Sequence, residues 1–249
     1  MLKDERHQHI LDELNIRNRI LLTDIALQLD VSEDTIRRDL KELHDDGKLK
    51  KVHGGAIAKS FNPFSFHEEE IYDRANKVVI AEKALTLLKD GQANIITGGT
   101  TNLELISLIP KNLSCTFFTP SLHAAMQLSQ FPNIDTILIG GKISPDAMVA
   151  TGGEALNLLS RLHVDLCFLG TGHLDAAFGL SEFDWEIVEL KQAIIRASRK
   201  VVSLTLSAKI NSIQRYKVSD LNSIHTLITE LNPDDKKLEK FVKLGLEVM

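Results

Sequence analysis

Apolar residues recur at helical spacing in two short segments at the start of the chain. The apolar positions of these segments are Ile10, Leu11 and Leu14, followed by Ile25, Ala26 and Leu29. Because each set covers one face of a 3.6-residue repeat, the pattern predicts two amphipathic helices. We expect the first helix to break within residues 15–19 and the second to end near Asp30.

A third segment, from Ser32 to Gly47, carries the signals of a helix with both ends defined. Ser32 can cap the N-terminus, and two acids follow in the first turn, where the helix dipole favours them. Gly47 has the place of a glycine that ends a helix. The expected buried stripe consists of Ile36, Leu40 and Leu43. The residues that remain facing solvent are Asp34, Arg37, Arg38 and Lys41, with Thr35 beside them.

Residues 48–57 alternate enough to predict two short strands, and Gly54 and Gly55 permit a tight backbone approach between them. The hairpin carries three lysines, namely Lys48, Lys50 and Lys51. Three helices followed by a basic hairpin are typical of a winged helix-turn-helix domain, which we expect over residues 1–58. Arg37 or Arg38 would then read guanine edges in the major groove, while the lysines neutralise phosphates.

The distribution of charge agrees with a local DNA interface on an acidic chain of net charge −5. Residues 1–34 hold four basic and eight acidic side chains, whereas residues 35–59 hold seven basic and four acidic ones. One small face can therefore be positive. Such a face gives modest non-specific affinity, so tight binding would need several copies of the module on one site.

Beyond residue 77 the pattern changes to alternating helices and strands, after a linker that we place at residues 59–76. Helical segments centre on residues 78–89, 101–109, 122–130, 154–162, 184–198 and 234–245. Strand-like runs are Asn94–Thr97, Cys115–Thr119, Thr136–Ile139, Asp165–Leu169, Val201–Leu206 and Thr226–Thr229. This alternation predicts an α/β domain over residues 77–249, with a mostly parallel sheet covered by helices on both faces.

Length and composition narrow the class of protein. The 249 residues suit one small domain and one of ordinary size. No apolar run approaches the roughly 18 residues of a membrane span, and the charged start is unlike a signal peptide, so we expect a cytoplasmic protein without membrane partners. Cys115 and Cys167 lie in apolar runs without metal-ligand spacing, and we interpret both as core residues. We expect no metal and no cofactor.

Several expected strands end in glycine or hydroxylic residues, at the edge where parallel sheets bind ligands. The first end consists of Gly98, Gly99, Thr100, Thr101 and Asn102 and opens a helix. Backbone N–H groups at such a turn suit a phosphate, although a plain strand-to-helix turn can use the same residues. The other strand ends contribute Ser121, Gly140, Gly141, Gly152, Gly170 and Gly172. Ser121 can equally be a helix cap, and Lys209 either adds an ammonium at this edge or is an exposed loop lysine.

The chain resembles the DeoR/GlpR family of bacterial transcriptional regulators over essentially its full length. The most specific signature is VSEDTIRRDLKEL…GKLKKVHGGA, and the segments IAEKAL, GGTTN, LIGGKI, FLGTG, ELKQAI and LITE follow in the family's order. The resemblance implies a C-terminal sensor domain similar to ribose-5-phosphate isomerase, usually without catalysis. It also implies repression of a sugar-catabolic operon that a phosphorylated sugar relieves.

The resemblance also implies roles for single residues. Thr35, Arg37 and Arg38 would contact DNA bases, and the DNA backbone would be touched by Ser32, His53, Gly54 and Gly55. Phosphate would be held by Gly99, Thr100 and Thr101, with help from Gly141, Gly152 and Lys209. Two departures stand out, because the family usually has aspartate where this chain has Thr97 and Leu206. Phosphate binding can survive both changes, whereas recognition of sugar hydroxyls is affected.

Three hypotheses follow. The first is a sequence-specific DNA-binding repressor that acts as a homo-oligomer, either a dimer or a tetramer, on double-stranded operator DNA. The second is a sugar-phosphate isomerase or deaminase with a DNA-binding extension, for which Glu186 or Glu189 would be a candidate base. Such an enzyme needs a general base in the cleft, and Thr97 and Leu206 argue against one. The third is an activator, which the sequence does not separate from a repressor.

Overall fold

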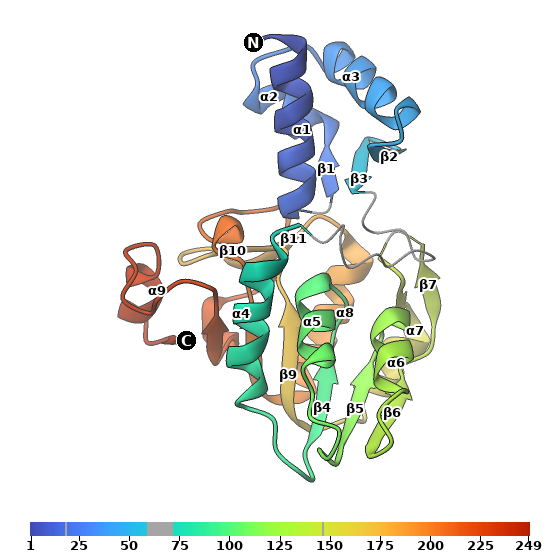
Figure 1. Cartoon of the computed structure of the whole chain (residues 1–249), viewed down its shortest axis with the longest axis vertical. Helices are drawn as coiled ribbons and strands as arrows, with labels where there is room; N and C mark the ends of the chain where they lie inside the picture. The colour runs from blue at the N-terminus through green and yellow to red at the C-terminus, as the bar shows by residue number, and fades with distance from the viewer. Residues whose placement is uncertain (18, 59–71, 146) are drawn as a thin grey trace. The chain divides into compact units, whose positions relative to one another are not determined.

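The computed structural model describes residues 1–17, 19–58, 72–145 and 147–249. These residues form two compact units, Met1–Tyr72 and Asp73–Met249, which we describe separately (Figure 1). The expected linker at residues 59–76 falls mostly on residues 59–71, outside the described residues. Its last residues belong to the second unit, because α4 (Arg74–Leu85) begins there.

The first unit combines three helices with a small antiparallel sheet. Its elements are α1 (Lys3–Arg17), β1 (Arg19–Leu21), α2 (Leu22–Gln28), α3 (Glu33–Asp45), β2 (Leu49–Val52) and β3 (Gly55–Ala58). The three expected helices and the hairpin are confirmed. The sequence reasoning missed β1, and α1 continues through Asn15 to Arg17, where we expected a break. A three-residue strand with a single buried side chain, Ile20, is too short to show a pattern of its own.

The core of the first unit explains why these elements pack as they do. The expected stripe of α3, formed by Ile36, Leu40 and Leu43, is fully buried against Ile10 and Ile25. The sheet has the order β1-β3-β2, and Gly55 lies where β3 crosses closest to β1. A Cβ at position 55 would lie 2.0 Å from the carbonyl oxygen of Ile20, so only glycine fits there.

The second unit is a seven-stranded sheet between two layers of helices. Its strands in spatial order are β15 (Glu247–Val248), β14 (Thr226–Ile228), β12 (Ser198–Leu204), β9 (Val164–Gly170), β4 (Ala93–Ile96), β5 (Cys115–Thr119) and β6 (Ile134–Leu138). Every neighbouring pair is parallel, as the sequence predicted. The helices other than α4 are α5 (Thr100–Ser107), α6 (Leu122–Leu128), α7 (Gly153–Leu159), α8 (Trp185–Arg196) and α9 (Glu239–Lys243).

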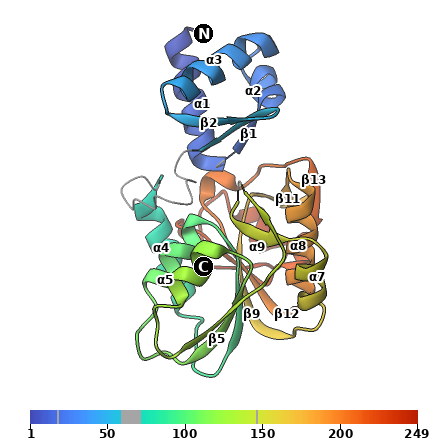
Figure 2. The ribbon, with the colours of Figure 1, turned by 90° about the vertical axis from the view of Figure 1, so that its right-hand side faces the viewer.

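Two apolar cores lie on the two faces of this sheet. Figure 2 shows α4 and α5 on one side of the strands and α7 and α8 on the other. The core under α4, α5 and α6 includes Ile96 and Phe117, and the core under α7 and α8 includes Ile95 and Val188. Cys115 and Cys167 are buried free thiols, one in each core, as expected.

Several small elements escaped the sequence pattern. They are β15 at the margin of the large sheet, the hairpin β7 (Lys142–Ser144) and β8 (Val149–Thr151), and a second small sheet of β10 (His173–Asp175), β11 (Gly179–Glu182) and β13 (Tyr216–Ser219). Strands of two to four residues do not show alternation clearly enough to be read. Within the described parts of the chain, no helix has both the length and the apolar character needed to cross a bilayer.

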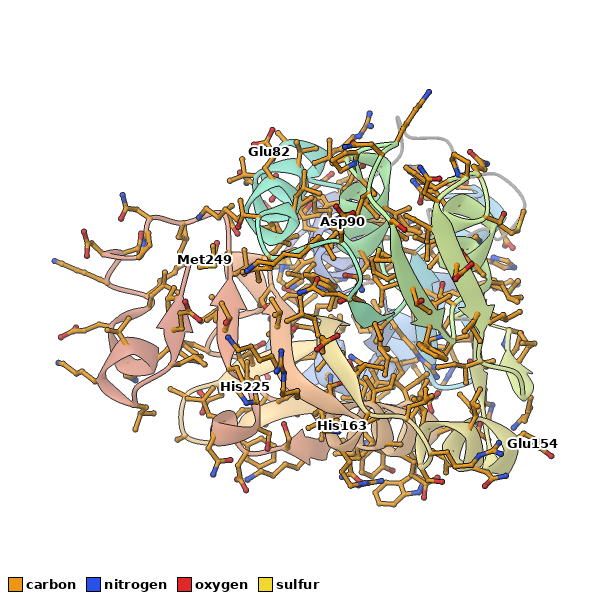
Figure 3. The ribbon with its side chains drawn as sticks, turned by 90° about the horizontal axis from the view of Figure 1, so that it is seen from below. Glu82, Asp90, Glu154, His163, His225 and Met249 are labelled. Atoms are coloured by element: carbon orange, nitrogen blue, oxygen red, sulfur yellow. The ribbon has the colours of Figure 1, made fainter. Side chains whose placement is uncertain are left out.

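The two edges of the sheet have different chemistry. In Figure 3 the sheet is seen from the edge at which the strands begin, marked by Asp90, His163 and His225, which come just before β4, β9 and β14. The candidate glycines and threonines follow the strands and therefore lie at the opposite, C-terminal edge.

Candidate functional site

The ends of α3 are fixed by the residues that the sequence indicated. The Oγ of Ser32 accepts a hydrogen bond from the backbone N–H of Thr35 at 3.2 Å. At the other end, the N–H of Gly47 donates to His44 and that of Lys48 to Leu43, the paired bonds of a Schellman motif. Helix α3 is thus a rigid thirteen-residue element that carries the expected DNA-contacting residues.

A buried carboxylate holds α3 against α1. Asp39 is 3% exposed and accepts two hydrogen bonds from the guanidinium of Arg6, at 2.8 and 3.1 Å. Nε2 of His7 lies 3.2 Å from the same carboxylate. A bidentate pair of this kind fixes orientation as well as distance. The sequence reasoning counted Asp39 only as a charge and missed its role in positioning the helix, because both partners lie on another helix.

The two arginines of α3 differ in their surroundings. Arg37 has a half-exposed side chain that is ion-paired with Asp34 and lies 3.9 Å from a Glu33 oxygen. Arg38 is exposed and makes no ion pair with any part of the chain that the structure describes. Arg37 would have to leave its carboxylate to contact a DNA base, whereas Arg38 would have no ion pair of the described chain to break.

The hairpin places its basic residues at the surface. Lys48 and Lys50 are exposed, Lys51 is partly buried, and His53 and Gly54 are exposed at the turn. Lys48 lies 3.7 Å from Asp46. Gly55, by contrast, is buried against β1, so its role within the structure is to let two strands approach.

In the second unit, the loop between β4 and α5 is shaped from inside by Asn102. This residue is fully buried, and its Nδ2 donates to the carbonyl oxygen of Thr97 at 2.9 Å and to the Thr97 hydroxyl at 3.0 Å. Gly98, Gly99 and Thr101 are partly exposed, and Thr100 is buried. The loop therefore presents its glycines and Thr101 outward, while Asn102 supports it.

Two strand ends meet at this loop. The Thr97 hydroxyl accepts a hydrogen bond of 2.8 Å from the backbone N–H of Gly170, at the end of β9. A Cβ on Gly170 would lie 2.6 Å from the carbonyl oxygen of Gly98, so the two loops are in backbone contact. Thr97, where the family resemblance led us to expect a carboxylate, here links the two candidate loops by its hydroxyl.

Two lysines converge on the Gly170–Gly172 loop. Nζ of Lys209 donates to the carbonyl oxygen of Thr171 at 3.1 Å, and Nζ of Lys191 donates to that of Gly170 at 2.7 Å. Lys191 is also ion-paired with Glu182, and both side chains are 10% exposed. Lys209 therefore lies at the edge where the sequence placed it as a candidate. Lys191, a residue of α8, also lies there and is buried.

A further lysine at this edge escaped the sequence analysis. Lys77, in the first turn of α4, is 5% exposed. Burial and the nearby positive charge of Lys209 lower its pKa from 10.5 to about 8, against the opposing effects of Asp73 and Glu104. An anion bound near these two ammonium groups would offset their mutual repulsion. The only sequence signal was a lysine at a helix start that the predicted range, 78–89, left out.

The remaining candidates lie around the same edge in other roles. Ser121 is 2% exposed and caps α6 through the N–H of Ala124 at 3.3 Å. Gly140 and Gly141 are exposed and Gly152 is partly exposed. Beside them, Glu186 accepts from Lys142 at 2.6 Å and from the Thr151 hydroxyl at 2.9 Å. This carboxylate, a candidate base in the enzyme hypothesis, thus bridges the β7–β8 hairpin and α8, and its pKa is lowered by both partners.

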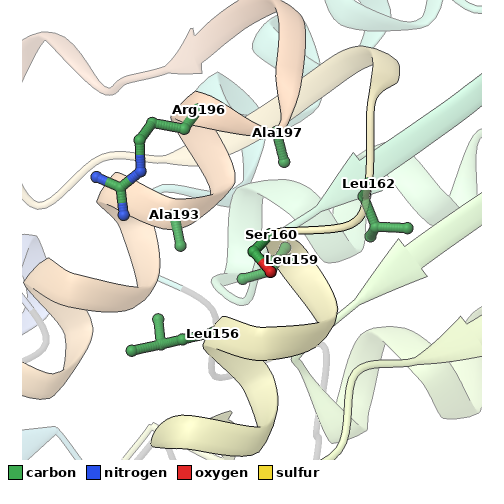
Figure 4. Close-up of a pocket in the computed structure, with 7 residues that line it drawn as sticks. All are labelled: Leu156, Leu159, Ser160, Leu162, Ala193, Arg196 and Ala197. Atoms are coloured by element: carbon green, nitrogen blue, oxygen red, sulfur yellow. The ribbon is translucent and has the colours of Figure 1, made fainter.

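A cavity of about 250 Å³ lies elsewhere, between the C-terminal turns of α7 and α8 (Figure 4). Its lining is apolar apart from Ser160 and Arg196. Because both helices run antiparallel to the strands, these turns lie at the N-terminal edge of the sheet, away from the glycines and lysines described above. The cavity and the candidate chemistry therefore do not coincide.

Comparison with known proteins places both units in one family. Residues 6–61 match the DeoR-like helix-turn-helix domain, and residues 73–231 match the DeoR C-terminal sensor domain. The HTH-type transcriptional regulator GolR of Listeria innocua is 33% identical over 250 residues, which cover 100% of this chain and 98% of that protein. The HTH-type transcriptional repressor GlcR of Bacillus subtilis is 30% identical over 261 residues, with 100% and 96% covered.

Among solved structures, ribose 5-phosphate isomerase A of Neisseria gonorrhoeae aligns with a TM-score of 0.40 and 16% identity, over 54% of this chain and 52% of that one. The family models together span most of the chain, and the regulator from Listeria innocua aligns with all of it. The chain belongs to the DeoR family of helix-turn-helix transcriptional regulators.

Proposed function

We propose that this protein is an operator-binding repressor of a carbohydrate-metabolism operon and that a phosphorylated sugar, bound by the second unit, controls it. The observation that carries the DNA-binding half is α3, a capped helix anchored through Asp39 that turns Arg37 and Arg38 to solvent beside a lysine-bearing hairpin. Guanidinium groups on such a helix suit guanine edges, and the hairpin lysines suit phosphates. The name of the relative GlcR supports repression.

We infer that the effector binds at the C-terminal edge of the sheet. There the glycine-rich loop at the start of α5 lies against Gly170, and Lys209 reaches the adjoining Thr171 carbonyl. Lys77 adds a second ammonium, whose pKa is lowered by burial and by the charge of Lys209. Backbone N–H groups at a helix start together with two cations are suited to a phosphate. The candidate ligand contacts are Gly98, Gly99, Thr100, Thr101, Gly141, Gly152, Gly172, Lys77 and Lys209.

The residues at this edge favour a binding site over the enzyme hypothesis. Thr97 and Leu206 supply no carboxylate, and Glu186 is held by Lys142 and Thr151. Glu182 is ion-paired with Lys191 in a buried position. A general base needs to reach the substrate with a lone pair that is not already engaged. We therefore propose a sensor without turnover.

Fluorescence anisotropy on the DNA upstream of the protein's own gene tests both halves. The titration is run near physiological salt, alone and with a panel of sugar phosphates, with unrelated DNA of equal length as the control. We expect preference for the upstream DNA, weakened by one phosphosugar. Equal affinity for both DNAs would contradict sequence-specific operator binding, and tighter binding with the sugar would contradict release of DNA by the sugar. A coupled assay that detects isomerised sugar would instead support the enzyme hypothesis.

A further inference from the structure

The two outer strands of the seven-stranded sheet are protected very differently. On one side the sheet ends in β15, which has two residues, Glu247 and Val248. On the other it ends in β6, which has five, from Ile134 to Leu138. Short edge strands limit pairing with other chains, whereas a longer edge leaves a row of backbone N–H and C=O groups open to a partner. The β6 side is thus the edge at which another strand can add.

The side chains of β6 leave this edge open. Ile137 is 39% exposed and Leu138 44% exposed. Because neighbouring residues of a strand point to opposite faces, apolar surface flanks the backbone edge on both sides. Charged residues and proline are the usual protection of an edge, and β6 contains one charge, Asp135, and no lysine or proline. Figure 1 shows β6 at the outer margin of the second unit, with α6 packed beside it.

We infer that β6 is the dimer interface of this protein, where it pairs antiparallel with β6 of a second copy. The pairing would join two seven-stranded sheets into one continuous sheet across a twofold axis. A second copy of this chain fits the edge, because two identical strands that pair antiparallel across a twofold axis offer each other the same backbone N–H and C=O groups. Such a contact closes after two subunits and leaves no further edge of this kind.

The amount of apolar surface agrees with a dimer. With Met126 on α6 and Ile143 on β7, which are 69% and 38% exposed, these side chains expose on the order of 350 Å² of apolar area. A specific interface buries about 800 Å² per partner, of which a little over half is apolar. The elements α6, β6 and β7 therefore supply most of the apolar part, and the strand backbone supplies hydrogen bonds.

A dimer is also consistent with the proposed DNA binding. The small positive face of one DNA-binding unit would give weak binding alone, and two copies on two half-sites would bind an operator tightly. The inference uses the proposed operator binding only as a reason for two copies. Its tests are hydrodynamic and chemical, so failure of DNA binding and failure of the interface are distinguishable.

Sedimentation velocity of the full chain at about 10 µM protein, without DNA, tests the inference through Ile137→Lys. We expect a dimer for the unaltered protein and a monomer for the variant, because each dimer would carry two lysines at the centre of its interface. Val242→Lys is the matched control, since Val242 is an exposed apolar residue of α9, 50% exposed, and should leave the dimer intact. A monomeric unaltered protein, or a dimer that survives Ile137→Lys, would overturn the inference.

Cross-linking gives a second test that does not depend on the lysine variant folding. Asp135→Cys, Thr136→Cys, Ile137→Cys and Leu138→Cys are oxidised mildly and examined on a non-reducing gel. Both natural cysteines are buried, and burial raises the thiol pKa to about 11 for Cys115 and about 12 for Cys167, so they compete little. At least one of the four variants should form a covalent dimer, because the residue nearest the twofold axis faces its own copy with Cβ atoms about 5 Å apart. Cross-linking by none of them contradicts the interface, and Val242→Cys is the control.

Discussion

The two units of this regulator present their candidate residues in opposite ways. In the first unit, Arg37, Arg38 and the hairpin lysines lie on the surface of short, locally defined elements. In the second, Lys77 and Lys191 at the sheet edge are buried, and Asn102 and Thr97 are engaged in joining loops beneath partly exposed glycines. Side chains that contact a large, rigid polyanion such as DNA have to extend from the protein surface. A site for a small anion has to enclose its ligand.

Removing the anchor of α3 should have the largest effect. Asp39→Ala leaves the Arg6 guanidinium, 13% exposed, without its carboxylate, which should cost the first unit about 3 kcal/mol of folding free energy. Urea denaturation followed by far-UV circular dichroism should show an earlier transition. The fluorescence of Trp185, the sole tryptophan, reports on the second unit and should not shift. Glu42→Ala, which breaks an exposed pair with Lys3, is the control, and an equal loss there would contradict the anchoring role.

Removing the available arginine should affect DNA binding but not folding. Arg38→Ala should weaken operator affinity by about 2 kcal/mol, roughly thirtyfold, and relax specificity at one base pair. Arg37→Ala should cost less, because Arg37 must first break its ion pair with Asp34. Anisotropy titrations on the operator and on single-base variants measure both. An unchanged affinity of both variants would show that α3 is not the reading helix.

Neutralising the lysine at the sheet edge should affect the effector but not DNA. Lys209→Met should weaken phosphosugar binding about tenfold, as expected for loss of one charged hydrogen bond. Isothermal titration calorimetry measures the affinity, and the operator affinity without effector should remain unchanged. Lys200→Met is the matched control, because Lys200 is an exposed lysine of β12, the strand that precedes the turn carrying Lys209. Equal effects of the two variants would contradict the site.

Effector binding should also depend on pH through Lys77. Burial and the charge of Lys209 lower its pKa to about 8, and a bound phosphate would raise it, so binding above pH 8 takes up a proton. Affinity should be nearly constant from about pH 7 to 8, where phosphate is mostly a dianion, and then fall by up to about tenfold per pH unit. The Lys77→Met variant should bind more weakly and lose this fall. A fall that persists in Lys77→Met would assign it to another group.

The smallest expected effect has the opposite sign. Asp34→Asn frees Arg37 and should tighten operator binding about twofold to threefold, in keeping with the low worth of an exposed ion pair. In the Arg37→Ala background, Asp34→Asn should give a smaller gain in operator affinity, because no arginine at position 37 remains to be freed from the ion pair. Anisotropy at one salt concentration compares the four proteins. A gain that is equal in both backgrounds would mean that Asp34 acts only by repelling phosphates.

The contrast between the units also explains what the sequence predicted well. The cap at Ser32, the end at Gly47 and the buried stripe of α3 depend on residues within one helix, so a local pattern is enough. The six expected strands and their parallel order follow from alternation with helices. Which strands become neighbours is not local, however, and β4 lies between β5 and β9, which brings Thr97 to Gly170.

The residues that the sequence did not reveal depend on contacts between elements far apart in the chain. Lys77 and Lys209 are brought together by the packing of α4 beside the strands, and no spacing in the chain records this. The pairing of Lys191 with Glu182 and of Arg6 with Asp39 likewise joins residues of different elements. Glycine and threonine at the strand ends indicated the ligand-binding edge of the sheet. The sequence does not distinguish Asn102, which supports the loop from inside, from Gly99, which lies at the loop's surface.

The most direct test of the central claim is one titration of labelled operator DNA, with and without the effector found in the panel, carried out on three proteins. The unaltered chain should bind the operator and should be released from it by the effector. Arg38→Ala should bind DNA weakly while still binding the effector by calorimetry, and Lys209→Met should bind DNA normally and resist release at the same effector concentration. This outcome would show a DNA reader and an anion sensor on separate units. Release of Lys209→Met at the concentration that releases the unaltered protein, or normal operator binding by Arg38→Ala, would contradict the account.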